Sequence, residues 1–254
     1  MCFDLDSHPP ILPIAGGALD HEDLILEAAD GNRLAAFRAR AAHPTRAGVV
    51  ILPDVRGLYS FYEELALRLA EAGIDALAFD YFGRVAGVAK RDADFPYMDY
   101  IPHMAMADMR ADVSAATAEL RRDGRVRATF TMGFCFGGRL AYNSGTFGLD
   151  LAGTIAFYGG PVSERPGFPA PITLAPAMAS PILGLFGGAD AGIPPEAISE
   201  FDAALTAAGV EHELITYPGA PHSFFDRKAA DFADAAADSW RRSLEFIAAR
   251  TPAA

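Results

Sequence analysis

Three side chains that together can activate a nucleophile come one after another along the chain, each after an apolar run: Cys135, Asp190 and His222. A thiol, a carboxylate and an imidazole can form a triad in which the acid orients the imidazole and the imidazole activates the thiol. An activated thiol attacks carbonyl carbon and holds the product as a covalent intermediate. These three residues are therefore the first candidates for chemistry.

Cys135 lies at the centre of the motif G-x-C-x-G, which is typical of a nucleophile elbow with cysteine in place of serine. A strand-to-helix turn that presents one side chain at its apex brings Gly133 and Gly137 together, so only small residues fit there. At the helix N-terminus, the dipole and free N–H groups favour the thiolate, and the Phe136 N–H can donate to an oxyanion. The alternative is a buried structural cysteine with glycines that serve close packing, and the motif alone leaves both open.

The positions of Asp190 and His222 favour the catalytic interpretation. Alone, Asp190 after a double glycine is most often a turn residue, and His222 in a proline-rich loop is most often solvated. Both follow predicted strands, however, and with Cys135 they have the chain order nucleophile, acid, histidine of an α/β-hydrolase. His103 is a rival base, but it precedes the nucleophile and follows no strand. We expect His222 to be the base and Asp190 to orient it.

Strands and helices must alternate to position these residues. Asp30-Gly31 tolerates positive φ and predicts a tight hairpin between the first two strands. Apolar runs predict strands at 23–29, 32–41, 48–52, 74–79, 126–132, 151–157, 181–186 and 212–217. Helical spacing predicts helices at 61–72, at 105–122, from Gly137, at 195–208 and at 228–249. This alternation predicts one α/β domain over 1–254, with a mostly parallel sheet of about eight strands, helices on both faces, and ligands beyond the carboxyl ends of the strands.

The composition excludes several classes of protein. The 254 residues are 51% hydrophobic and 21% charged, which is typical of a folded globular chain. The formal net charge of −12 repels phosphate backbones, so we expect no nucleic-acid partner. No apolar run could span a membrane and the N-terminus does not resemble a signal peptide, so we expect a cytoplasmic protein with no membrane partner. Cys2 and Cys135 are too few for a disulfide framework or zinc cluster, and we expect no metal or cofactor.

From about residue 22 to 249, the sequence resembles the dienelactone hydrolase family, a cysteine branch of the α/β-hydrolases. The matching segments are GFCFGG at 133–138, FYGG at 157–160, GGAD at 187–190 and PGAPHSF at 218–224. The resemblance implies an α/β-hydrolase fold and hydrolysis of small esters or lactones through an acyl-cysteine. It also implies that Cys135 is the nucleophile, His222 the base and Asp190 the acid.

The resemblance assigns further residues around the nucleophile. An acid that contacts the nucleophile, normally Glu in the family, falls on Asp54, which is one methylene shorter. The alternative for Asp54 is a simple loop or helix-cap residue. The second oxyanion N–H, beside that of Phe136, falls on Val55, and a pocket tyrosine falls on Tyr158.

Departures from the family pattern concern the substrate. Members that act on dienelactone hold its carboxylate with two arginines, one of them four residues after the histidine. That position is Asp226 here, followed by Arg227. The other region, Asp92–Met106, contains no arginine, and Arg91 stands just ahead of it. We therefore expect neutral esters or lactones to be preferred over anionic ones.

The segment 95–106 is apolar and too rich in proline for a strand or a helix interior. It is a candidate lid, with Phe95, Tyr97 and Met98 lining the substrate pocket. The alternative is a loop that packs on the outside of the sheet.

Two other functions compete with ester hydrolysis. One is a ligand-binding protein with an idle triad, which the fold alone does not exclude. The other is a thiol peroxidase that uses Cys135, which the absence of a nearby resolving cysteine disfavours. The sequence leaves the natural substrate and the oligomeric state open.

Overall fold

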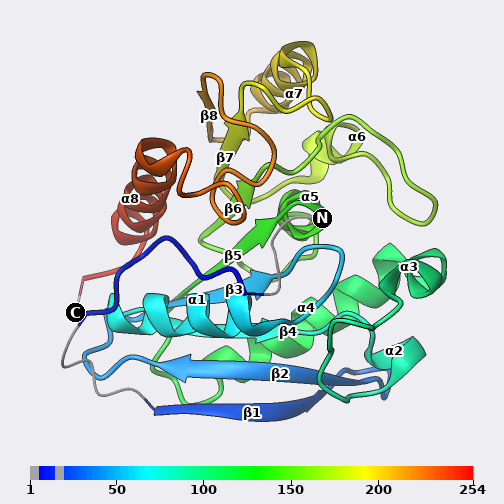
Figure 1. The fold of residues 1–254 in the computed structure, drawn as a ribbon, viewed down its shortest axis with the longest axis vertical. Coiled ribbons are helices and arrows are strands. Elements are labelled where there is room, and N and C mark those ends of the chain that lie inside the picture. The colour runs from blue at the N-terminus through cyan, green and yellow to red at the C-terminus, as the bar shows by residue number, and fades with distance from the viewer. Residues whose placement is uncertain (1–5, 15–19, 254) are drawn as a thin grey trace.

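The structure, a computed structural model, describes residues 6–14 and 20–253 and contains one eight-stranded sheet (Figure 1). The strands are β1 (Asp20–Glu27), β2 (Arg33–Arg40), β3 (Ala47–Leu52), β4 (Asp75–Phe79), β5 (Ala128–Phe134), β6 (Gly153–Phe157), β7 (Ile182–Gly187) and β8 (His212–Tyr217). Their order in the sheet is β1-β2-β4-β3-β5-β6-β7-β8. The six strands from β3 to β8 are parallel, whereas β2 is antiparallel to both of its neighbours.

Helices connect the parallel strands. The longer ones are α1 (Ser60–Glu71), α4 (Met106–Arg121), α5 (Phe136–Ser144), α7 (Pro195–Ala208) and α8 (Ala233–Ala249). The short ones are α2 (Gly83–Ala86), α3 (Tyr97–Tyr100), α6 (Pro171–Leu174) and two 3₁₀ turns, Ile101–His103 and Ala175–Ala177. In Figure 1, α1 passes in front of β3 and β4 while α4 lies behind them, and α8 and α7 lie on opposite sides of β6 to β8. Helices therefore cover both faces of the sheet, as the sequence predicts.

The central strands are buried along their whole length. Every residue of β3, β4, β5, β6 and β7 is buried, which explains why these segments are continuous apolar runs in the sequence. Helix α1 buries Phe61, Leu65 and Leu69, which are four residues apart and therefore lie on one face. The core thus lies between the sheet and one face of each long helix.

The register of the sheet aligns the carboxyl ends of its strands. Leu52 in β3 pairs with Gly133 in β5, which pairs with Ala156 in β6, and Gly187 at the end of β7 pairs with Tyr217 at the end of β8. The loops that follow these strands therefore meet at one edge of the sheet. All the residues assigned to the candidate site from the sequence follow one of these strand ends, apart from the segment 95–106.

The expected hairpin is confirmed: β1 and β2 are antiparallel, and Gly31 between them has φ of 81°. The predicted start of the last helix at residue 228 is wrong, because α8 begins at Ala233. The intervening residues form turns, in which the Ser223 carbonyl accepts hydrogen bonds from the N–H groups of Asp226 and Lys228. This segment holds the residues after His222 close to the site instead of continuing the helix.

Candidate active site

Cys135 is the single residue between strand β5 and helix α5. Its backbone has φ of 55°, a conformation that costs a non-glycine residue on the order of 1–3 kcal/mol. Its N–H donates to the Phe157 carbonyl at 3.0 Å, and its carbonyl accepts from the Arg139 N–H at 3.1 Å. These bonds tie the strained residue to β6 and to the first turn of α5, and the side chain is partly exposed. The geometry is that of a nucleophile elbow.

The glycines of the motif are required by close backbone approach. A Cβ atom on Gly133 would lie 1.9 Å from the Gly137 carbonyl oxygen, and one on Gly137 would lie 2.0 Å from the Leu52 carbonyl oxygen. Both distances are far shorter than any real Cβ contact. The elbow therefore packs directly against the end of β3, which brings the loop that starts at Pro53 beside Cys135.

His222 and Asp190 are joined by a short hydrogen bond. Nδ1 of His222 donates to Oδ2 of Asp190 at 2.6 Å, and Oδ1 of the same carboxylate accepts from the Gly192 N–H at 2.8 Å. Asp190 is buried, whereas the His222 side chain is 35% exposed. Both oxygens of the acid are thus committed, and the Nδ1 atom of His222 is tied to Asp190.

The electrostatics favour a charged imidazole at this position. Burial by itself lowers the pKa of His222, but the hydrogen bonds with Asp190 and Cys135 and the negative charges of these partners outweigh it and raise the pKa to about 10. The three residues predicted as a triad are therefore brought together by the structure. A thiolate and an imidazolium that are hydrogen-bonded stabilise each other.

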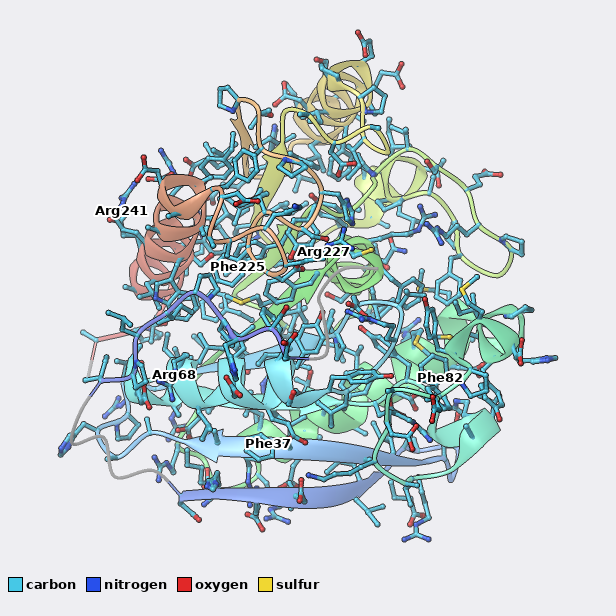
Figure 2. All side chains as sticks on the ribbon, viewed as in Figure 1. Phe37, Arg68, Phe82, Phe225, Arg227 and Arg241 are labelled. Atoms are coloured by element: carbon cyan, nitrogen blue, oxygen red, sulfur yellow. The ribbon has the colours of Figure 1, made fainter. Side chains whose placement is uncertain are left out.

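Aromatic packing holds the loop that carries His222. Phe224 and Phe225 are fully buried, and the Phe225 ring lies 4.7 Å from that of Phe157, which in turn stacks on Phe134 at 4.7 Å. Figure 2 shows Phe225 and Arg227 on this loop, in front of the central strands. The loop between β8 and α8 is therefore anchored on the residues that end β5 and β6.

Asp54 is fully buried and is bound by Arg56. The Arg56 side chain donates to Oδ2 at 3.1 Å and to Oδ1 at 3.4 Å, and the Arg56 backbone N–H donates to Oδ1 at 2.8 Å. Burial raises the pKa of Asp54, and the charge of Cys135 raises it further, while Arg56 lowers it. Asp54 does not cap a helix, since the N-cap of α1 is Tyr59. It is both a turn residue and a neighbour of the thiol.

Two backbone amides, those of Phe136 and Val55, are the candidate oxyanion donors. Phe136 is the first residue of α5, so its N–H has no acceptor within the helix. The Val55 N–H donates to no protein acceptor in the parts of the chain that the structure describes. The Phe136 ring is fixed edge-on between Tyr81 at 5.4 Å and Phe168 at 5.3 Å.

Tyr158 contacts the imidazole and a second buried acid. Its ring centroid lies 4.9 Å from that of His222, and its hydroxyl donates to Oδ2 of Asp226 at 2.7 Å. Burial raises the pKa of Asp226 to about 7, with a further rise from the charge of Asp54, although the hydrogen bonds from Tyr158 and Arg227 oppose the rise. The residue that stands where the family has an arginine is therefore turned inward, whereas Arg227 is exposed.

A cavity of about 120 Å³ contains Cys135, Phe136, Tyr158 and His222. Arg139 and Arg165 also line it, and none of the described residues that line it is an Asp or a Glu. The Arg139 guanidinium donates to the carbonyls of Gly160, Ser163, Phe168 and Pro169, so it organises the loop that it lies under. Burial, with the nearby charge of Arg165, lowers the pKa of Arg139 to about 10.

The expected lid residues lie elsewhere. Phe95, Tyr97 and Met98 are not among the residues that line this cavity. Phe95 stacks on Tyr100 at 5.3 Å and under the Arg91 guanidinium at 4.5 Å, and Met98 is 64% exposed. Phe95 therefore packs on Tyr100 and Arg91 and not on the cavity beside the thiol.

Arg91 is bound to another acid and does not reach the thiol. Its Nε and one terminal nitrogen donate to Oδ2 of Asp80 at 3.0 and 2.7 Å. Arg91 and Tyr59 line a larger cavity, of about 720 Å³, between the first hairpin, the start of α1 and residues 88–93. That cavity contains neither Cys135 nor His222, so its size does not make it the reaction site.

Among residues 6–14 and 20–253, no group of three or more His, Cys, Asp or Glu side chains could hold a metal ion. Within the same residues, no helix is long and apolar enough to cross a membrane.

Sequence reasoning missed several residues at this site. Arg139 follows Cys135 by four residues on α5, so helical spacing alone places it on the same face one turn later. The pairing of Asp54 with Arg56 is visible as an i, i+2 spacing of opposite charges. The bond between Tyr158 and Asp226, and the position of Arg165, have no local signal.

Comparisons with known proteins identify the family to which the chain belongs. The model of the dienelactone hydrolase family matches residues 34–250. A Yersinia pestis protein named "Putative carboxymethylenebutenolidase" is 30% identical over 205 residues, which cover 78% of this chain and 76% of that protein.

Solved structures show the same fold. A crystal structure titled "Putative Dienelactone Hydrolase" from Klebsiella pneumoniae has a TM-score of 0.78 and 27% identity, and the match covers 91% of this chain and 99% of that one. An esterase from Pyrococcus furiosus matches with a TM-score of 0.70 at 14% identity, over 97% of this chain and 99% of that one. The α/β-hydrolase fold expected from the sequence is thus confirmed.

Proposed function

Because this chain belongs to the dienelactone hydrolase family, we propose that it hydrolyses small esters or lactones through an acyl-cysteine formed on Cys135. The observation that carries the proposal is the position of His222, bound through Nδ1 to Asp190 and hydrogen-bonded to the thiol on its other side. A histidine that is merely solvated would not need a buried carboxylate at Nδ1, and a cysteine that serves only packing would not need an imidazole beside its thiol. The cavity supplies room for the reacting carbonyl directly beside the sulfur.

Acylation begins from a thiolate and an imidazolium. The Sγ atom of Cys135 attacks the carbonyl carbon, and the carbonyl oxygen takes up the negative charge. The N–H groups of Phe136 and Val55 stabilise that charge, which is a contribution of about 3–4 kcal/mol per donor in related acyl transfers. The imidazolium of His222 then gives its proton to the leaving alkoxide, and the C–O bond breaks.

Deacylation uses the same groups in reverse. Neutral His222 takes a proton from a water molecule, the hydroxide attacks the thioester carbon, and the C–S bond breaks to release the acid and regenerate the thiolate. Asp190 stabilises the imidazolium in both halves and keeps the correct tautomer between them. For a lactone, the alcohol and the acid are parts of one product.

Asp54 acts on the thiol through its charge in this proposal. A buried carboxylate near Cys135 disfavours a second negative charge on sulfur. Arg56, which holds both oxygens of Asp54, offsets that repulsion from within the same loop. The resting balance between thiol and thiolate is therefore set by Asp54 and Arg56 together with His222.

Turnover of p-nitrophenyl acetate and of an unsubstituted lactone tests the proposal. We expect a burst of p-nitrophenol and an acetyl group on Cys135, detected by mass spectrometry after acid quenching. Cys135→Ala should bind the lactone and not open it. Binding of esters and lactones without turnover would favour the idle ligand-binding protein, and rapid peroxide consumption without ester cleavage would favour the thiol peroxidase.

A further inference from the structure

A second pair of residues, Tyr158 and Asp226, lies against the imidazole of His222, in addition to Asp190. Tyr158 is fully buried and Asp226 is 5% exposed, so their 2.7 Å hydrogen bond is shielded from water. The Tyr158 ring lies 4.9 Å from the His222 ring, so the hydroxyl bond holds the ring in contact with the imidazole. The two residues come from different loops, after β6 and after β8.

The backbone at this pair is strained, which indicates a fixed geometry. Tyr158 has φ of 40°, and Ser223, the residue after His222, has φ of 65°. Each conformation is unfavourable for a residue that carries a side chain and persists only where surrounding contacts over-determine it. Here the contacts are the buried hydroxyl bond and the packing of Phe224 against the Tyr158 ring at 5.6 Å. The loop of His222 is therefore held by the hydrogen bond of Asp226 with Tyr158 and by the packing of Phe224 on the same tyrosine ring.

The charge environment of Asp226 is asymmetric. Asp54 faces it from the loop after β3 and opposes its ionisation, whereas His222 on its own loop favours it. Tyr158 donates from the loop after β6, and the Arg227 backbone N–H donates to Oδ1. Asp54 is paired with Arg56, but Asp226 forms no ion pair with a Lys or Arg of the described chain.

We propose that Asp226 is a positioning residue of the active site: it fixes Tyr158 against His222 and, when ionised, stabilises the imidazolium by its charge. Two carboxyl groups then act on the imidazole: Asp190 is bonded to it directly, and Asp226 acts through Tyr158. The inference deepens, and in its kinetic part rests on, the proposed hydrolase function.

The pair gives the site a titration near neutral pH that the triad itself does not supply. The pKa of His222 is raised to about 10, so the imidazole stays protonated through the neutral range beside the thiolate. Burial raises the pKa of Asp226 to about 7, so this carboxyl changes charge in that range. The imidazolium should therefore be most stable above neutral pH, when Asp226 carries its charge.

The test is a proton NMR titration of the Cε1–H of His222 in protein labelled at histidine, with the resonance assigned by its loss in His222→Gln. The wild type should show a small inflection near pH 7 and the main inflection near pH 10. In Asp226→Asn, which keeps an acceptor for the Tyr158 hydroxyl, the neutral inflection should vanish and the main one should move down by about half a unit or more. Asp231→Asn, an exposed acid on the same loop, is the matched control and should change neither.

A second variant keeps the inference testable if Asp226→Asn does not fold. Tyr158→Phe removes a donor to the ionised carboxyl, so the neutral inflection should move up by about one unit. An unchanged pair of inflections in either variant would overturn the proposal. Because the titration needs no substrate, it distinguishes failure of this inference from failure of the hydrolase function.

Turnover gives a further readout of positioning. We expect Asp226→Ala to lower kcat about tenfold, because Tyr158 loses its anchor, while Asp226→Asn restores most of that loss and has a flatter pH profile between 6 and 8. Equal losses in the Ala and Asn variants, with the wild-type pH profile retained, would show that Asp226 does not act in this way.

Discussion

Oδ2 of Asp190 lies 2.6 Å from Nδ1 of His222, and the other oxygen of the same carboxylate is held by the Gly192 N–H. The acid is therefore oriented by its own loop before it orients the imidazole. Because both of its oxygens are hydrogen-bonded, the carboxylate keeps its orientation when the imidazole changes its protonation state.

Asp190→Asn should lower kcat far more than it changes substrate affinity. The amide destabilises the imidazolium and permits the wrong tautomer, and serine triads lose up to about 10⁴ from this change. The loss here should be smaller, because a thiol needs less help from its base. Steady-state kinetics check it, with Asp202→Asn as control, since Asp202 contacts His212 on the surface at 3.2 Å. Near-normal kcat in Asp190→Asn would remove this residue from the mechanism.

Cys135 should be the reactive thiol. Iodoacetamide should inactivate the protein in proportion to the label on Cys135, because this thiol combines a helix N-terminus with a nearby imidazole. Cys135→Ala should stay folded without turnover, and Cys135→Ser should keep at most a trace. Cys2, which lies outside the described residues, serves as control, and Cys2→Ala should behave as the wild type. Full activity with Cys135 alkylated would contradict the mechanism.

Gly133→Ala should destabilise the fold by several kcal/mol, because its Cβ would overlap the Gly137 carbonyl and the backbone there cannot move without opening the elbow. Gly160→Ala is the matched control, since its nearest neighbour would lie at 3.9 Å. Thermal melts of the two variants compare them directly. A melting temperature of Gly133→Ala close to that of Gly160→Ala would show that the elbow is looser than the structure has it.

Neutral esters and lactones should outcompete anionic ones by roughly tenfold in kcat/KM. Asp226 stands where the family has an arginine, Arg91 is committed to Asp80, and the terminal nitrogens of Arg139 donate to carbonyls. Arg165 lines the cavity but is exposed, so solvent screens it.

The measurement compares a carboxylated lactone with its neutral methyl ester at low and high salt. Arg165→Ala should change the ratio of the two kcat/KM values by less than about threefold. A preference for the carboxylate that salt weakens and that Arg165→Ala, Arg91→Ala or Arg227→Ala abolishes would show that a cation binds the substrate.

Asp226→Asn should stabilise the protein at pH 8. The folded state raises the pKa of this carboxyl to about 7 from an unfolded value of 3.8, so the folded state binds more protons between these values and the free energy of unfolding falls as pH rises through this range. Above about pH 7, the buried carboxylate of Asp226 destabilises the folded state to its full extent, and the uncharged side chain of Asn removes this destabilisation. Melting temperatures should rise by a few degrees at pH 8, and the difference should shrink toward pH 4. A constant difference at all pH values would mean that ionisation of Asp226 is not the cause.

The sequence predicts the parts of this site that depend on local rules. Cys135, Asp190 and His222 each follow a strand of the parallel part of the sheet, so the sheet alone brings them to one edge. The pairing of Tyr158 with Asp226 depends on how two loops pack, and no spacing encodes it. The position of Phe95 cannot be predicted from the sequence either, because tertiary contacts rather than the apolar character of its segment place it against Arg91.

The positive φ of Cys135 has a consequence for sequence change in relatives that no longer need the reaction. Glycine adopts positive φ without penalty, so an exchange of Cys135 for glycine would relieve the strain and make the chain more stable. Selection for stability alone would therefore erode the cysteine, and only a demand for its thiol opposes that change. A lineage in which the fold survives merely as a binder should have lost the cysteine first, which makes the residue at this one apex a marker of whether descendants of the chain still carry out chemistry.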